Sequence, residues 1–212
     1  MSAVTAGVSS DESPLVITRP KTDRPNRWNP PTTLAAGLAG GIEEFGVGPD
    51  EAVLDVGCGT GNLTAALLAR LGPNGRVVAF DIAPAMLEVA RAKNLDEART
   101  WWLEADAERL PLAAGSFDRV ICFSVWPHFD HPAAAALELA RVLRSGGRLH
   151  VWHLASRAHI NSIHASASPA VRGDLLAPGS EVAAVLETAG LAPVQVVDDE
   201  ARYLVSAVKR TG

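Results

Sequence analysis

The sequence has few cysteines, no long apolar run and no cluster of basic residues, and each of these absences excludes a class of protein. Cys58 and Cys122 are the only cysteines among the 212 residues. One lies in a glycine-rich turn and the other in an apolar run, which is no disulfide framework, so we expect two reduced, buried thiols. No apolar run has the length of a membrane span, and the first residues lack a secretory signal pattern. We therefore expect a cytoplasmic protein with no membrane partner.

The charge balance argues against nucleic acid as a partner. The chain carries 24 acidic residues against 19 Lys and Arg, with a formal net charge of −5 and an isoelectric point near 5.7. Its basic residues are scattered, whereas proteins that bind nucleic acid usually concentrate them on one face. A small-molecule partner is the better expectation, and the composition leaves the oligomeric state open.

Strand-like and helix-like patterns alternate through most of the chain. We expect strands at residues 53–56, 76–81, 100–105, 117–125 and 148–153, with helices that begin near Leu63, Pro84 and Pro132. Strands that alternate with helices in this way form a sheet whose two faces are both covered. This order of elements predicts a parallel sheet with helices on both sides.

The end of the chain departs from this alternation. A helix over residues 180–189 is followed by two strand patterns, at 193–197 and 203–209. The short connection between those two strands can only join antiparallel neighbours. The predicted fold class is therefore α/β: a doubly wound, mostly parallel seven-stranded sheet with one antiparallel terminal strand.

The domain organisation is simple. Residues 1–26 are rich in Ser, Thr, Asp and Pro without a sustained period, which is typical of a flexible arm. Residues 27–212 read as one domain. It would begin with a glycine-containing helix capped by Thr32 or Thr33, and it would carry a helical insertion at about residues 154–178.

The first strand leads into the most informative stretch of the sequence, Leu54-Asp55-Val56-Gly57-Cys58-Gly59-Thr60-Gly61. Glycine permits positive φ angles and a close approach of the backbone to a ligand, and the helix that follows adds free N–H groups. A dinucleotide-binding turn would place its third glycine at position 62, which is Asn62. The stretch instead resembles motif I of the class I S-adenosylmethionine (SAM)-dependent methyltransferases.

This resemblance extends over about residues 52–147. Leu-Pro-Leu-x-x-x-Ser-Phe-Asp at 110–118 and the run at 141–147 are most similar to the ubiquinone/menaquinone-type methyltransferases. It implies the same doubly wound fold and S-adenosyl-L-methionine as the cofactor. A purely structural role for the glycines and for acids at strand ends is the alternative.

The residues expected at the cofactor come from three consecutive strand-to-helix connections. Asp81 would accept hydrogen bonds from the ribose hydroxyls, and Asp106 with Ala107 would face the adenine. Asp55 would attract the charged end of the cofactor, through water or the turn. Ile82 and Met86 would supply apolar cover for the adenine, although Met86 could instead belong to the core. The full candidate set is Asp55, Gly57, Cys58, Gly59, Gly61, Asp81, Ile82, Met86, Asp106 and Ala107. Asp118 is expected to be structural.

All six histidines fall between residues 128 and 164, on the edge where a methyl acceptor must approach. His128 follows the fourth strand and could take a proton from the acceptor, or it could merely close its loop. Trp126, in the same loop, is a candidate for acceptor binding. His131, directly before Pro132, is expected to start a helix.

A polar stripe follows the fifth strand. His153, Arg157, Asn161 and His164 are spaced by four, four and three residues, which places the last three on one helical face. We expect a pocket in which His153 and His164 are catalytic, while Arg157 and Asn161 bind the acceptor. A partly exposed helix with incidental polar residues is one alternative. A metal site of His153, His164 and His128 is another, although no close pair of ligands supports it, so no metal residue is assigned.

The sequence thus predicts SAM-dependent methyl transfer to a small-molecule acceptor with an O, N, S or C nucleophile. Catalysis would consist mainly of positioning the acceptor and excluding water. Two alternatives remain: a non-catalytic SAM-binding partner protein and a metal-assisted methyltransferase. A methyltransferase for nucleic acid or protein would normally bring a basic surface or an added recognition domain, and neither is visible.

Overall fold

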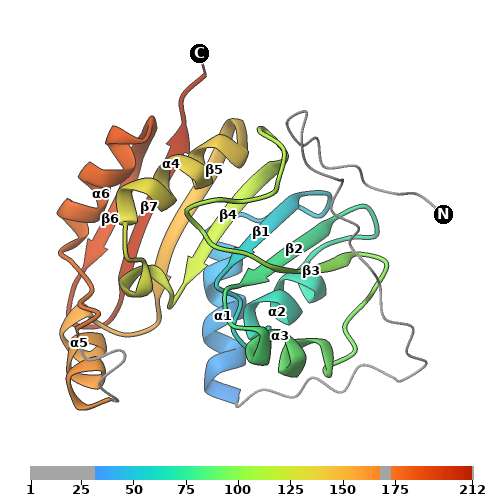
Figure 1. The fold of residues 1–212 in the computed structure, drawn as a ribbon, viewed down its shortest axis with the longest axis horizontal. Helices are drawn as coiled ribbons and strands as arrows, with labels where there is room; N and C mark the ends of the chain where they lie inside the picture. Colours follow the sequence, from blue (N-terminus) through green and yellow to red (C-terminus); the bar gives the residue numbers. More distant parts are fainter. Residues whose placement is uncertain (1–31, 168–172, 212) are drawn as a thin grey trace.

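The computed structural model describes residues 32–167 and 173–211 (Figure 1). The predicted arm, residues 1–26, lies outside these ranges. The strands form one sheet in the order β3-β2-β1-β4-β5-β7-β6. Their bounds are β1 (Ala52–Val56), β2 (Arg76–Asp81), β3 (Thr100–Glu104), β4 (Phe117–Phe123), β5 (Leu143–His153), β6 (Leu191–Asp198) and β7 (Tyr203–Lys209).

The directions of the strands confirm the predicted fold class. β1 lies between β2 and β4 and is parallel to both, and β2–β3 and β4–β5 are also parallel pairs. β7 runs antiparallel to β5 and to β6. The strand order therefore reverses at β1, and in such sheets ligands bind at that point, beyond the carboxyl ends of the strands.

Helices cover both faces of this sheet. Their bounds are α1 (Thr32–Glu44), α2 (Asn62–Arg70), α3 (Pro84–Arg91), α4 (Pro132–Val142), α5 (Arg157–Ser166) and α6 (Gly179–Thr188), with a 3₁₀ turn η1 (Trp126–His128). The cores on the two faces are separate: α4 and α6 pack on one face, and α1, α2 and α3 on the other. In Figure 1, α5 stands apart from both layers, at the end of the sheet where β5 terminates.

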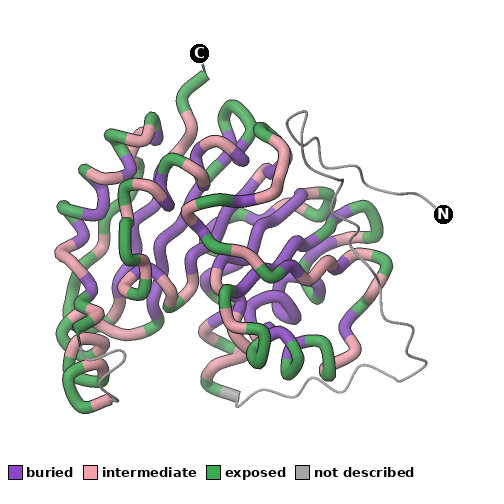
Figure 2. Tube along the Cα trace, viewed as in Figure 1, coloured by how far each residue is buried: buried purple, intermediate pink, exposed green. Residues whose placement is uncertain are grey.

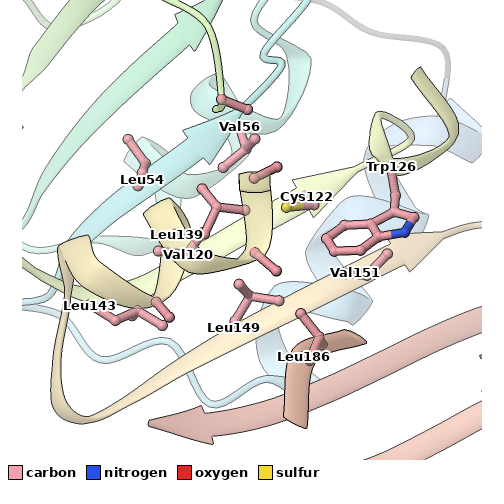
Figure 3. Packing of buried hydrophobic residues seen from close by; sticks show 14 of the residues in the cluster. Leu54, Val56, Val120, Cys122, Trp126, Leu139, Leu143, Leu149, Val151 and Leu186 are labelled. Atoms are coloured by element: carbon pink, nitrogen blue, oxygen red, sulfur yellow. The ribbon is translucent and has the colours of Figure 1, made fainter. Parts of the chain in front are cut away.

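Alternate residues of the central strands contribute to the two cores. Val53 and Ile121 face the α1–α2–α3 side, while Leu54 and Cys122 face the α4–α6 side. In Figure 2 the central strands are mostly buried, whereas exposed residues lie on the surrounding helices and loops; Figure 3 shows the packing on the α4–α6 side. Both cysteines are buried and free, as expected.

The start of β5 differs from the sequence prediction, and the glycines of α1 have a packing role that the sequence did not show. β5 starts at Leu143 rather than at 148, because a register shift opposite Phe117 accommodates residues 144–147 within the strand. The glycines of α1, which weaken it as an isolated helix, permit close packing on the sheet. A Cβ at Gly41 would lie 2.3 Å from the ring of Trp152.

A partly buried ion pair joins the segment between α1 and β1 to the sheet. Arg119 of β4 is 4% exposed and forms a bidentate salt bridge with Glu51, with N···O distances of 2.7 and 2.8 Å. The same guanidinium donates to the carbonyl of Phe45 at 2.9 Å and contacts the ring of His150. Such planar pairs fix geometry well, so this cluster positions the segment that leads into β1 and the glycine turn.

Candidate cofactor and acceptor site

The glycine turn has the backbone conformation that the sequence predicts. Gly57, Gly59 and Gly61 have φ angles of 59°, 51° and 77°, a region that other residues rarely adopt. A Cβ at Gly57 would lie 2.2 Å from Val125, and one at Gly61 would lie 2.8 Å from Trp102. A Cβ at Gly59 would meet nothing within 4 Å. Gly57 and Gly61 are thus required by packing as well, whereas Gly59 borders open space.

Asp81 connects the end of β2 to this turn. Its Oδ2 accepts a hydrogen bond from the Gly59 N–H at 2.8 Å, and its Oδ1 accepts one from the Ala83 N–H at 2.9 Å. The side chain is 9% exposed. A carboxylate has about four acceptor sites, so these two bonds fix its orientation and leave lone pairs for two ribose hydroxyls.

Asp55 lies below the turn and not on its surface. It is 1% exposed and accepts a hydrogen bond of 2.5 Å from the hydroxyl of Thr64 in α2. Burial raises its pKa from 3.8 to about 7, against the effect of the Thr64 hydrogen bonds. Any attraction of Asp55 for a bound cation therefore acts through the turn.

The remaining candidates for the cofactor follow β2 and β3 or belong to the glycine turn. Ile82 and Met86 are 68% and 45% exposed, so the alternative of a core role for Met86 is wrong. Asp106 is exposed and its carboxylate accepts from the N–H of Glu108, which forms a tight turn that holds the buried Ala107. Burial raises the pKa of the Cys58 thiol, so its side chain stays protonated and is not a reactive thiolate.

The three histidines proposed as catalytic come together, and Asp174 joins them. His128 Nδ1 lies 2.7 Å from the carboxylate of Asp174. His164 Nδ1 makes a short hydrogen bond to the backbone carbonyl of the same residue. The rings of His128 and His164 are 5.0 Å apart and tilted by 39°. Sequence reasoning missed Asp174, because no motif connects it to a histidine 46 positions earlier.

His153 is the buried member of this group. It is 1% exposed, and neither ring nitrogen has a hydrogen-bond partner among the described residues. Burial, followed by the neighbouring His164 and His128, lowers its pKa from 6.5 to about 4. His153 is therefore neutral at physiological pH.

The other acceptor candidates make different contacts from those expected. Residues from Arg157 onward are helical, but Arg157 pairs with Asp198 at 2.9 Å. Asn161 makes two hydrogen bonds with the backbone of Leu176, at 2.8 and 3.2 Å. The polar face of α5 thus binds the chain's own later segments. Trp126 is 3% exposed and belongs to the core beside Val151 (Figure 3), because the 3₁₀ turn directs its ring inward.

Two expected structural roles are confirmed. His131 is the residue that precedes α4, and its ring contacts Glu108 at 3.0 Å. Asp118 accepts from the N–H of Ala52 at 2.6 Å and pairs with Arg144. Within residues 32–167 and 173–211, no group of three or more His, Cys, Asp or Glu side chains has a metal-binding arrangement. In the same ranges, no helix is long and apolar enough to cross a bilayer.

The glycine turn and its surroundings match a known family. Residues 54–151 fit the family model described as a methyltransferase domain. In structure, the chain resembles a SAM-dependent methyltransferase from Aquifex aeolicus, with a TM-score of 0.69 at 23% identity, over 81% of this chain and 89% of that one. Residues 54–151 are therefore similar to the methyltransferase domain family, and the chain shares its fold with that SAM-dependent methyltransferase structure. The cofactor that this domain implies is SAM.

Curated relatives are similar over about half of the chain. A ubiquinone/menaquinone biosynthesis C-methyltransferase of Ectopseudomonas mendocina is 40% identical over 52% of this chain and 44% of its own length. A malonyl-[acyl-carrier protein] O-methyltransferase of Hahella chejuensis is 43% identical over 46% of this chain and 34% of its own. The match thus spans less than half the length of these relatives. One transfers methyl to carbon and the other to oxygen, so the shared segment does not define the acceptor atom.

Proposed function

We propose that this protein transfers a methyl group from SAM to a small-molecule acceptor. The proposal rests on the hydrogen bond between the N–H of Gly59 and the carboxylate of Asp81, the acid that ends the next strand. Gly59 belongs to the glycine turn, and the space beside its Cα is open. The match of residues 54–151 to the methyltransferase domain model and the similarity to curated methyltransferases support the proposal. We further propose that residues 27–212 act as one domain, with the insertion at about residues 154–178 on the acceptor side; residues 27–31, 168–172 and 212 lie outside the described residues.

The chain's own residues would hold the cofactor as follows. Asp81 would accept hydrogen bonds from the ribose hydroxyls, and the exposed Ile82 and Met86 would cover the adenine, with Asp106 and Ala107 at its edge. The bound cofactor supplies an electrophilic methyl group on a sulfonium. The protein's contribution is to align an acceptor lone pair with that methyl group and to exclude water.

The acceptor would approach at the carboxyl ends of β4 and β5. His128 follows the first of these strands and His153 ends the second. His128 and Asp174 are partly exposed, at 36% and 28% of their side chains, so a ligand can reach them. Because Arg157 is already paired with Asp198, we do not assign it as an anchor for an anionic acceptor.

The test is turnover of SAM with a panel of phenols, alcohols, amines, thiols and carboxylates, followed as S-adenosylhomocysteine formed. We expect turnover with at least one class and no effect of EDTA. Tight SAM binding without product in the whole panel would favour the non-catalytic partner protein. Loss of activity in EDTA, restored by a metal, would favour the metal-assisted alternative.

A further inference from the structure

One residue, Asp174, contacts two histidine rings at the acceptor edge. Its side chain contacts Nδ1 of His128 at 2.7 Å, and its backbone carbonyl contacts Nδ1 of His164. Asn161 fixes this segment by bonding to both backbone groups of Leu176, two residues later. Asp174 is thus held in place from α5, while the ring that its carboxylate contacts belongs to the turn after β4.

These contacts determine which ring nitrogen carries the proton. A carbonyl oxygen and an ionised carboxylate can only accept a hydrogen bond, so Nδ1 must be the donor in both rings. In a neutral imidazole, the proton on Nδ1 leaves a lone pair on Nε2. Among the described residues, the ring of His128 has a hydrogen-bond partner only at Nδ1. Its Nε2 is therefore available to an incoming group.

We propose that His128 and Asp174 form a proton-accepting pair, which makes this site specific for acceptors that must lose a proton from a hydroxyl or an amine. His128 is the catalytic base and Asp174 its positioning residue. In the reaction, the acceptor gains the methyl group and gives its proton to Nε2 of His128, while the electron pair of the broken carbon–sulfur bond stays on the sulfur. This proposal rests on the proposed function and adds the class of acceptor to it.

The surroundings of His128 suit this role. The titratable groups that face it are Asp174, His164 of α5 and His153 at the end of β5. His153 is held neutral by burial, so it adds no positive charge beside the ring. A histidine that must become cationic is then stabilised by the Asp174 carboxylate, as in other histidine–carboxylate pairs.

The first experiment needs no acceptor. Long-range ¹H–¹⁵N NMR of the ring nitrogens, on the full chain at a pH where His128 is neutral, reports which nitrogen carries the proton. We expect the Nδ1–H tautomer for His128 in the native protein and a mixture of tautomers in Asp174→Ala. An Nε2–H tautomer of His128 in the native protein overturns the proposal, whether or not the protein is a methyltransferase.

The second experiment measures turnover with the phenols, alcohols and amines of the panel, at saturating SAM. General bases contribute about 10²–10⁴-fold, so we expect kcat to fall at least about 100-fold in His128→Gln and about tenfold or more in Asp174→Asn. Added imidazole should restore part of the activity of His128→Ala. SAM affinity, measured by calorimetry, should remain within about twofold in all these variants.

His131 and Glu108 provide a matched control. They form a second histidine–carboxylate pair, at 3.0 Å, and the side chain of His131 is 73% exposed. His131→Gln and Glu108→Gln should leave kcat, imidazole dependence and the tautomer of His128 unchanged. Equal losses in the two pairs, or native kcat in His128→Gln with hydroxyl and amine acceptors, would overturn the proposal. Failure of the native protein to bind SAM would instead refute the proposed function.

Discussion

Replacing Gly59 by alanine tests whether a ligand approaches the backbone of the turn. The three glycines of the turn all have positive φ angles, but only at Gly59 would an added methyl group meet nothing within 4 Å. The methyl group of Gly59→Ala would therefore enter the space that we assign to the cofactor. Gly146 is the matched control, since its φ is 74° and a Cβ there also meets nothing within 4 Å.

The structure separates the two effects of this substitution. A non-glycine residue in the left-handed region costs about 1–2 kcal/mol, so Gly59→Ala and Gly146→Ala should lower the free energy of unfolding by similar amounts. Only Gly59→Ala should also weaken SAM binding, by at least about tenfold, which corresponds to ~1.4 kcal/mol. Gly59→Val, with a bulkier side chain, should abolish binding.

The assay is calorimetric titration with SAM, beside chemical denaturation of each variant. Gly57→Ala should be the least stable of the set, because its Cβ would lie 2.2 Å from Val125. If Gly59→Ala binds SAM as tightly as Gly146→Ala, the backbone of the turn does not contact the cofactor and the reasoning is wrong.

Three further substitutions test the site from other directions. Asp81→Ala should weaken SAM binding by about 1.5–3 kcal/mol, the scale of hydrogen bonds to a charged group. It should also destabilise the turn, because the N–H of Gly59 loses its acceptor. Unchanged affinity in a calorimetric titration would show that Asp81 does not bind the ribose. Asp55 has a raised pKa of about 7 because it is buried, so its contribution to stability is complete below about pH 4 and is lost as the pH rises through 7. Native protein should lose on the order of 1.4 kcal/mol per pH unit in that window relative to Asp55→Asn, and parallel stability curves from urea denaturation would contradict this. Asn161→Ala should lower kcat without changing SAM affinity, because the Leu176 backbone that holds Asp174 would lose two hydrogen bonds. An unchanged kcat in this variant would show that Asn161 has no positioning role.

The fold was predictable because its main signals are local. The parallel sheet follows from apolar strands alternating with helices, and the antiparallel β6–β7 pair follows from the short connection before Tyr203. The assignment of Asp81 was also within reach, because an acid at the end of the second parallel strand must lie beside the turn after the first. Its bond to Gly59, by contrast, depends on the side-chain rotamer and on the exact course of the turn.

The acceptor side was predicted only in part, for a physical reason. Helical spacing shows that Arg157, Asn161 and His164 share a face, but it does not show what that face contacts. The contact is the chain's own segment around Leu176 together with Asp198, and this depends on how the chain folds back after α5. Asp174 was missed for the same reason.

The most direct test of the central claim is a structure of the full chain with S-adenosylhomocysteine bound. The account predicts the ribose hydroxyls within hydrogen-bond distance of Asp81, the backbone of Gly59 against the ligand, and the sulfur directed toward His128. A ligand bound elsewhere, or one whose ribose leaves Asp81 bonded only to Gly59 and Ala83, would contradict it.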